Sequence, residues 1–400
     1  MLEGYVHPDF SDVAETLRRQ IPGSKRRFAP GGAAVCVWHR GEVVVDCWGG
    51  TRNADGDPWD EDSIALSFST TKGVAATLLH VFADRGVVDY DAPVCEYWPE
   101  FAQGGKADLT VRQLLAHQAG LYHVRDMIGH ASELLDWERM TRALASSRPC
   151  HEPGRAHGYH AFTFGFLVGE IVQRVAGKPF REVLETELAQ PLELDGLFVS
   201  VPEDQMHRRA ELIPTARRGN RRSPDRFARV GRIVNRGLRF ARVPIDLADM
   251  ASALMPKGIE DFDFGSEEVA RASIPAVNGY FSARSLAKLY AALAAGGSLG
   301  DVRILSPETI TRASEVHSWG IGRVVPYPMH WRLGYHRVNT IGVRSKRGFG
   351  HSGFGGSGGW ADPDRDLAVA LTLNSGTGTP FGDLRIVQIG SAALRCADRR

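Results

Sequence analysis

The stretch Ala65–Gly73, ALSFSTTKG, places a serine three residues before a lysine and leads into the helical sequence GVAATLLHVFADRG. If a helix begins near Ser69, Lys72 lies on the same face one turn later, within reach of the serine hydroxyl. A serine hydroxyl is a weak nucleophile that needs a neighbouring base, and a lysine can be that base only if its pKa falls. The alternative is that Ser69 merely caps a helix. The tetrapeptide alone leaves both interpretations open.

The N-terminal side of this stretch predicts a helix and a β-hairpin. Residues 9–20 show apolar positions at helical spacing. Residues 31–53 contain two β-branched runs on either side of Arg40-Gly41, a pattern typical of two strands joined by a tight turn.

The C-terminal side predicts a mainly helical middle followed by strands. From Ser69 to about residue 200 the pattern is mainly helical, with breaks at glycine and proline. A further helix is expected at 282–297 and a closing helix in the last twenty residues. The strand-like runs between them are HWRLGYHRV, GFGHSGFGG, GGWADPDRD and LAVALTLN.

These elements predict an α+β fold with one antiparallel sheet built from both ends of the chain. We expect an α/β region from residues 1–82 and 275–400, in which the terminal helices flank the sheet. A helical region, residues 83–274, is expected between these two parts, and it includes an arginine-rich insertion at 207–243.

Composition excludes several classes of function. The 400 residues carry a formal net charge of +1, so no overall field favours nucleic acid or a membrane surface. The five cysteines are scattered without a CxxC pair, which indicates reduced thiols rather than a zinc site. No signal peptide or apolar transmembrane run is apparent, so we expect a cytoplasmic protein. We also expect no metal, no cofactor, and no nucleic-acid or membrane partner.

The arginine-rich insertion has two interpretations. Residues 207–243 contain twelve arginines against Glu211 and Asp225 alone. Such a segment could bind anions or nucleic acid. Because the charge of the whole chain is near zero, a solvated insertion balanced by acidic surface elsewhere is the favoured interpretation.

Two further stretches carry candidate chemistry. Tyr159, in EPGRAHGYHAFTFGFLVGEIV, follows a turn and precedes an amphipathic helix. A tyrosine beside a lysine ammonium loses its proton more easily and can act as a general base, although most tyrosines at helix starts only pack. The second stretch is GFGHSGFGGSGGWADP, whose glycines allow a ligand or backbone to approach closely.

The ordered set of motifs resembles the serine β-lactamase and penicillin-binding-protein superfamily, and most closely the class C-like branch that includes family VIII carboxylesterases. The resemblance covers nearly the whole chain. The motifs that carry it are STTK, LTVRQLLAHQAGL, the EPG approach to Tyr159, WRLGY, GHSGFGGSGGWADP and LAVALTLN.

The resemblance implies a catalytic set and places it in a cleft between the α/β and helical regions. Ser69 matches the acylated nucleophile, and Lys72 matches the partner that takes its proton. Tyr159 matches the tyrosine that shares the base role and protonates the leaving group.

The same resemblance implies an oxyanion and substrate-binding strand. His351, Ser352 and Gly353 stand where lactamases have Lys-Thr-Gly. The backbone N–H groups of Ser69 and Phe354 would then form the oxyanion hole.

Departures from the lactamase pattern favour an esterase. The motif Tyr-x-Asn is Tyr159-His160-Ala161 here, and an alanine cannot donate an amide hydrogen bond to substrate. His351 replaces a lysine, which removes a permanent cation for a substrate carboxylate. We therefore predict a carboxylesterase that acts on small-molecule esters with short or compact acyl groups. The alternatives with the same site are a β-lactamase, a D-aminopeptidase-like amidase or an acyltransferase; the oligomeric state is not predicted.

Several other features are expected to be decoys. Gly355–Gly359 fits the nucleophile elbow Gly-x-Ser-x-Gly, but strand-like sequence follows it and no histidine occurs after His351. Ser285 and Lys288 repeat the Ser-x-x-Lys spacing inside an amphipathic helix, so we expect packing or surface residues there. We expect His117 and His123 to be structural residues and not metal ligands. Three aromatic residues are equally suited to a wall of the site or to the core: Trp331, Trp360 and Phe354.

Overall fold

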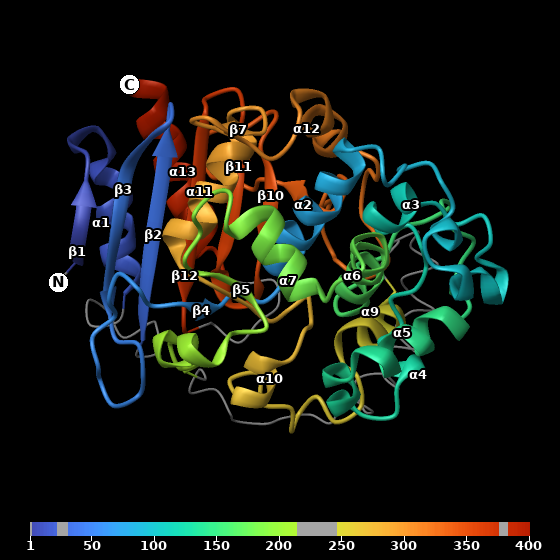
Figure 1. Ribbon diagram of the computed structural model, residues 1–400. Coiled ribbons are helices and arrows are strands. Elements are labelled where there is room, and N and C mark those ends of the chain that lie inside the picture. The colour runs from blue at the N-terminus through green and yellow to red at the C-terminus, as the bar shows by residue number, and fades with distance from the viewer. Residues whose placement is uncertain (1, 22–30, 214–245, 376–382) are drawn as a thin grey trace.

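The predicted antiparallel sheet is present in the computed structural model, which describes residues 2–21, 31–213, 246–375 and 383–400. In the described chain, seven strands pair in the order β1-β3-β2-β12-β11-β10-β9 (Figure 1). All six pairings are antiparallel. The strands are β1 (Leu2–Val6), β2 (Gly32–His39), β3 (Glu42–Gly50), β9 (His336–Arg337), β10 (Phe349–Ser352), β11 (Gly358–Asp362) and β12 (Leu367–Leu373).

The two ends of the chain meet in the middle of this sheet. The predicted hairpin joins β2 to β3, and both turn residues have positive φ, 53° at Arg40 and 76° at Gly41, as a type I′ turn requires. Strand β2 then pairs with β12, with Val37 opposite Val369. The expectation of one sheet built from both ends is therefore confirmed.

Helices cover both faces of the sheet. Helices α1 (Ser11–Gln20) and α13 (Arg385–Arg399) pack on one face, and α11 (Ala283–Ala294) packs on the other (Figure 1). Every residue of β12 is buried, which explains why its sequence LAVALTL is apolar at every position except Thr372 instead of alternating.

In its described residues, the inserted region is mostly helical but contributes one strand that the sequence pattern did not reveal. Strand β5 (Leu197–Val199) pairs with β6 (Gly279–Phe281), which pairs with β4 (Ala65–Leu66). This small sheet joins the insertion to the segment just before Ser69. The helices of the insertion are α3 (Val111–Leu115), α4 (Val124–Met127), α5 (Trp137–Ser146), α6 (Thr163–Ala176), α7 (Phe180–Leu184), α9 (Leu247–Leu254) and α10 (Glu267–Arg271).

Two elements are shorter than expected. The strand predicted in HWRLGYHRV is limited to His336–Arg337. Within the predicted helical middle, the motif LTVRQLLAHQAGL forms only the short helix α3, because the chain turns at His117, whose φ is 59°. The remaining elements are α2 (Thr71–Asp84), α12 (Pro307–Ser314), β7 (Ser298–Leu299) and β8 (Val302–Arg303).

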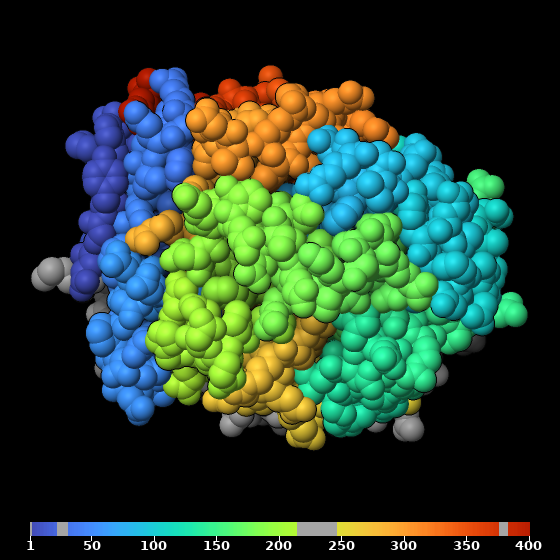
Figure 2. Space-filling view, viewed as in Figure 1, coloured from blue at the N-terminus to red at the C-terminus, as the bar shows by residue number. Residues whose placement is uncertain are grey.

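Figure 2 shows the face on which residues of about 180–210 lie between the sheet strands on the left and the helical region on the right. In the described ranges, no helix is both long enough and apolar enough to cross a bilayer.

Candidate active site

Ser69 lies in a tight turn that leads into α2, two residues before the helix begins at Thr71. Backbone hydrogen bonds fix the turn at the residues before and after Ser69. Ser67 donates its N–H to the carbonyl of Gly279 on β6 at 2.8 Å, and Phe68 adopts a left-handed φ of 44°. Lys72 closes the turn by donating its N–H to the Ser69 carbonyl at 3.1 Å. This short turn keeps Ser69 partly exposed while Lys72 is buried beneath it.

The Lys72 amine is fully buried and contacts three oxygen atoms. Its Nζ lies 2.6 Å from the carbonyl oxygen of Ala161, 2.9 Å from that of Ala276 and 3.1 Å from Ser69 Oγ. Burial holds the pKa of Lys72 well below its usual value. A neutral amine has two N–H donors and one lone pair. If the two carbonyls take both donors, the lone pair is left facing Ser69 Oγ.

Tyr159 completes the contacts of Ser69. Its hydroxyl donates to Ser69 Oγ at 2.7 Å, and Lys72 Nζ lies 4.9 Å from the centre of its ring. Burial raises the pKa of Tyr159, and the hydrogen bond with Ser69 lowers it by less. This direction is opposite to the sequence-based expectation that a neighbouring ammonium would ease loss of the phenol proton. The reason is that the same burial neutralises both groups.

The end of β10 lies against the Ser69 turn. Gly353 is required there, because a Cβ at this position would meet the Ser67 carbonyl oxygen at 2.2 Å. Ser357 ties the same two segments together: its Oγ donates to the Ser67 carbonyl at 3.0 Å and lies 3.3 Å from Thr70 Oγ1. Among the described residues, neither the N–H of Ser69 nor that of Phe354 has a hydrogen-bond partner.

His351 is a neutral buried group and not an exposed cation. Its side chain is 3% exposed, and its Nδ1–H donates to the Ser352 carbonyl at 2.8 Å. Burial lowers the pKa of His351 well below its usual value, with smaller contributions from His336 and Lys72. A buried neutral imidazole cannot take the role of the lysine ammonium that lactamases use at this position.

Trp331, which the sequence left open between a site wall and core, and two histidines that the sequence did not assign to the site lie around Tyr159 and His351. Trp331 stacks on Tyr159 with ring centres 5.3 Å apart and planes 4° apart, and His117 packs against both rings. His336 contacts the rings of Trp331 and His351. Nothing in the local sequence distinguishes these residues from ordinary core residues.

The two remaining aromatic candidates differ in exposure. Phe354 is 39% exposed and its ring lies 5.3 Å from that of Phe68, beside the nucleophile turn. Trp360 belongs to the core between the sheet and α13, where it packs against Gly390. Phe354 is therefore available as a wall of the site, and Trp360 is not.

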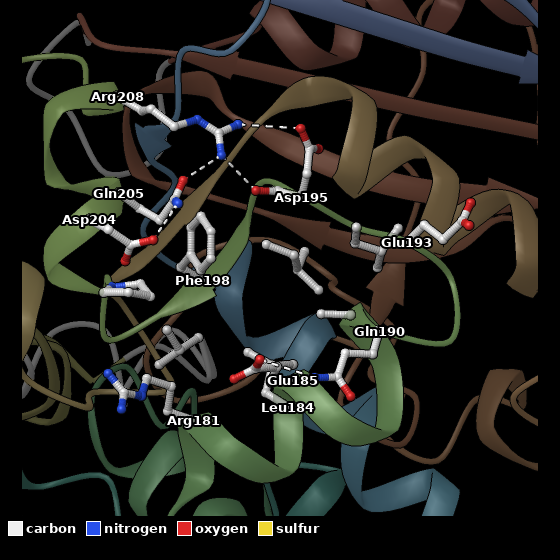
Figure 3. A pocket seen from close by; sticks show the side chains of 15 residues that line it. Arg181, Leu184, Glu185, Gln190, Glu193, Asp195, Phe198, Asp204, Gln205 and Arg208 are labelled. Carbon is white, nitrogen blue, oxygen red and sulfur yellow. Dashed lines mark hydrogen bonds and ion pairs between the residues drawn. The ribbon is translucent and has the colours of Figure 1, made fainter.

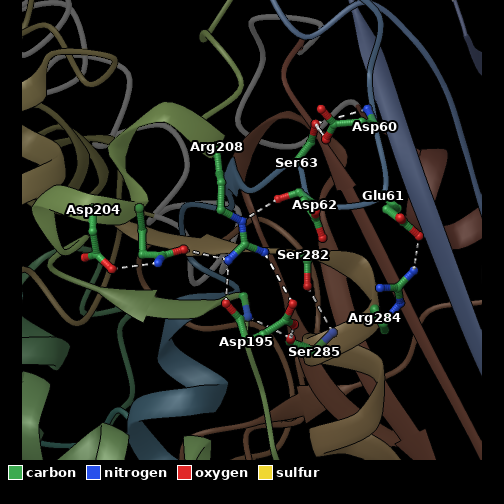
Figure 4. Close-up of polar contacts among 12 residues, drawn as sticks. Asp60, Glu61, Asp62, Ser63, Asp195, Asp204, Arg208, Ser282, Arg284 and Ser285 are labelled. Carbon is green, nitrogen blue, oxygen red and sulfur yellow. Dashed lines mark hydrogen bonds and ion pairs between the residues drawn. The ribbon is translucent and has the colours of Figure 1, made fainter.

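The decoy serines are committed to structural contacts. Ser357, the serine of the apparent nucleophile elbow, is buried and precedes strand β11 instead of a helix. Ser285 lies in the first turn of α11, nearer the helix start than expected; its Oγ donates to Asp195 and accepts the N–H of Gly196, both at 3.0 Å (Figure 4). Lys288 pairs with Glu193 at 3.5 Å.

Most of the arginine-rich insertion, residues 214–243, lies outside the described residues. Arg208 is described, and it donates to the carbonyls of Asp62 and Asp195 and to the Gln205 side chain (Figure 4). Arg208 therefore links the start of the arginine-rich insertion to the loops that contain Asp62 and Asp195.

A cavity of about 610 Å³ is separate from the predicted site (Figure 3). It lies between α7, the π-helical segment Glu185–Ala189, β5 and the 3-10 helix Glu203–Arg208. Leu184 and Phe198 line it together with charged residues such as Asp204. None of the predicted catalytic or oxyanion residues lines it.

Buried neutral histidines predict a loss of stability in mild acid. Burial lowers the pKa of His80 and His336 to about 4 and that of His160 to about 3. Between about pH 6.5 and 4 these histidines are protonated in the unfolded chain but stay neutral in the folded chain. Each histidine therefore lowers the free energy of unfolding by up to about 1.4 kcal/mol per pH unit as pH falls. Urea denaturation at pH 7.5 and 5.5 measures this loss.

The control for this prediction compares one buried and one exposed histidine. His80→Gln should reduce the pH dependence, and the exposed His207→Gln should leave it unchanged. An equal free energy of unfolding at pH 7.5 and 5.5 would contradict the prediction.

Comparison with known proteins gives consistent matches along the chain. The Beta-lactamase family model matches residues 25–394. The Esterase/beta-lactamase LipL of Mycobacterium tuberculosis is 38% identical over 375 residues, covering 93% of this chain and 82% of that protein. A solved family VIII carboxylesterase has a TM-score of 0.83 and 33% identity, covering 99% of this chain and 100% of that chain. A penicillin-binding protein homolog from Caulobacter crescentus has a TM-score of 0.84 and 32% identity, with the same coverage.

The family match spans most of the sequence, and the fold and the order of the site motifs agree with it. This chain belongs to the beta-lactamase family, within the beta-lactamase/transpeptidase-like superfamily.

Proposed function

We propose that this protein is a carboxylesterase that cleaves small-molecule esters through an acyl-enzyme on Ser69. The observation that carries the proposal is the contact of Ser69 Oγ with both Lys72 Nζ and Tyr159 OH. A hydroxyl between a neutral amine and a phenol has an acceptor for its own proton and a donor for a leaving group.

In the proposed acylation step, the lone pair of Lys72 takes the proton of Ser69 as Oγ attacks the ester carbonyl. The N–H groups of Ser69 and Phe354, which have no partner in the described part of the chain, would stabilise the oxyanion, aided by the N-terminus of α2. Collapse of the tetrahedral intermediate expels the alkoxide, which receives the phenol proton of Tyr159. Lys72, now an ammonium 4.9 Å from the centre of the tyrosine ring, returns a proton to Tyr159.

In the proposed deacylation step, water attacks the acyl-enzyme and the same pair of groups accepts its proton. Ser69 Oγ leaves with a proton and the carboxylic acid is released, so that ester and water give acid and alcohol. Because Lys72 and Tyr159 interact closely, their titrations are coupled, and the proton of the attacking water belongs to the pair.

Three observations support esters over β-lactams. His351 is buried and neutral, so it offers no cation for a substrate carboxylate. Ala161 offers no side-chain amide, and its backbone carbonyl is occupied by Lys72. Phe354 and Phe68 present apolar surface beside Ser69, which suits compact uncharged acyl groups. The name of one similar protein, a family VIII carboxylesterase, agrees with this preference.

Hydrolysis of β-lactams is the second candidate, because the name of the Mycobacterium tuberculosis relative includes it. A substrate panel separates the candidates: p-nitrophenyl acetate and butyrate, nitrocefin, a D-amino acid amide, and ester plus an alcohol acceptor. We expect kcat/KM for p-nitrophenyl acetate to exceed that for nitrocefin by about 10²-fold or more, since a missing cation and amide leave the lactam carboxylate and side chain unpaired. Equal or greater kcat/KM for nitrocefin would replace the esterase proposal with a β-lactamase.

A further inference from the structure

Ser352, the second residue of the His-Ser-Gly strand end, is held by a histidine from the neighbouring edge strand. The Nε2 atom of His336 lies 2.9 Å from the backbone N of Ser352 and 3.1 Å from Ser352 Oγ. His336 belongs to β9, the last strand of the sheet, and its backbone is opposite Gly350 on β10. The imidazole therefore extends along β10 from Gly350 to Ser352, toward the end of the strand that lies against the Ser69 turn.

The tautomer of His336 follows from its second nitrogen. Nδ1 lies 2.8 Å from the carbonyl oxygen of Arg337, so Nδ1 carries the proton and Nε2 carries the lone pair. The side chain is 4% exposed, and burial lowers the pKa of His336 to about 4. At neutral pH the ring is uncharged, and its single Nε2 lone pair accepts the N–H of Ser352, with Ser352 Oγ 3.1 Å from the same nitrogen.

This acceptor lies where pairing with the edge strand stops. Strand β9 pairs with β10 only at Phe349 and Gly350, and Ser352 then donates its N–H to a side chain instead of a strand. Two residues later, the N–H of Phe354 has no partner among the described residues. The His336 ring thus satisfies the N–H two residues before the proposed oxyanion donor, and the N–H between them, that of Gly353, donates to the Ser357 carbonyl at 2.8 Å.

We propose that His336 is a positioning residue: its neutral imidazole fixes Ser352 and so holds the end of β10 with the Phe354 N–H aimed at the substrate carbonyl. This inference rests on the proposed function, because it assigns a role in the same ester-cleaving site. His336 touches neither Ser69 nor the reacting atoms in this assignment.

The test compares His336→Phe, which keeps a ring without an acceptor, with His336→Gln, which retains an acceptor oxygen. With p-nitrophenyl acetate, we expect His336→Phe to lower kcat about tenfold and to change KM by less than about threefold, since a misplaced oxyanion donor acts in the transition state. His336→Gln should recover most of the lost kcat. The matched control is His39→Phe, a buried histidine on β2, which should leave kcat unchanged.

A double-mutant comparison with Ser352→Ala tests the coupling. Ser352→Ala should lower kcat several-fold in the native background and by less than about twofold in His336→Phe, because the clamp is already broken. Equal effects of Ser352→Ala in both backgrounds would overturn the inference. So would a kcat for His336→Phe within about twofold of the native value, or a change confined to KM.

Two further results keep the outcomes separate. If His336→Phe does not fold, His336→Gln and Ser352→Ala decide. A native kcat in both variants contradicts the inference. A lowered kcat in Ser352→Ala together with a near-native kcat in His336→Gln supports it. Loss of the proposed function is distinguishable, because it would show as full esterase activity in Ser69→Ala, whatever the His336 variants do.

Discussion

Ser69→Ala is expected to lower kcat/KM for p-nitrophenyl acetate by about 10⁴-fold or more, because removal of a covalent nucleophile abolishes the acyl-enzyme route. Ser69 is partly exposed and its side chain holds no backbone group, so the variant should keep the native fold. Fixed-time hydrolysis assays measure the loss of kcat/KM, and circular dichroism on the same samples measures whether the native fold is kept. Intact-mass analysis after a fluorophosphonate should show one adduct on the native protein, which peptide mapping places on Ser69.

The matched control is Ser285→Ala, which removes the serine of the other Ser-x-x-Lys sequence. Ser285 contacts Asp195 and Gly196 and should leave kcat/KM within about twofold, as expected for a residue outside the site. An adduct on Ser357 would instead make the glycine-rich elbow the nucleophile. No adduct, together with full activity of Ser69→Ala, would exclude the acyl-enzyme mechanism.

Lys72→Met is expected to lower kcat by about 10³-fold or more, because the amine in contact with Ser69 Oγ is lost and general-base catalysis ends. Lys72→Arg should fail to the same extent, since a guanidinium stays protonated and cannot accept the serine proton. In the native protein the neutral amine is the active form. Its pKa is lowered by burial, so kcat/KM should rise with pH through that lowered pKa and be constant above it.

Pre-steady-state acylation rates and pH profiles of kcat/KM check this prediction. Lys288→Met, which changes the lysine of the second Ser-x-x-Lys sequence, is the control and should keep the native profile. Activity above about a tenth of native in Lys72→Arg would exclude Lys72 as the base, because a permanently protonated side chain could not support such a rate.

The sequence determined the features that depend on neighbouring residues. Alternating and continuous apolar runs specified the strands, Arg40-Gly41 specified the hairpin turn, and the spacing of Ser69 and Lys72 placed both at one helix start. Such patterns are legible because turn conformation and helical spacing act over only a few residues. The order of motifs was enough to indicate the family.

Only the tertiary structure decided how the site works. It brings Tyr159, ninety residues away, to within 2.7 Å of Ser69, and it sets the carbonyls of Ala161 and Ala276 on the Lys72 amine. Backbone carbonyls have no sequence signature, and neither does the contact between His336 and Ser352. The protonation states also depend on burial by the whole chain, which is why a tyrosine expected to lose its proton easily instead holds it more tightly. Desolvation sums over all surrounding atoms, so no local pattern can specify it.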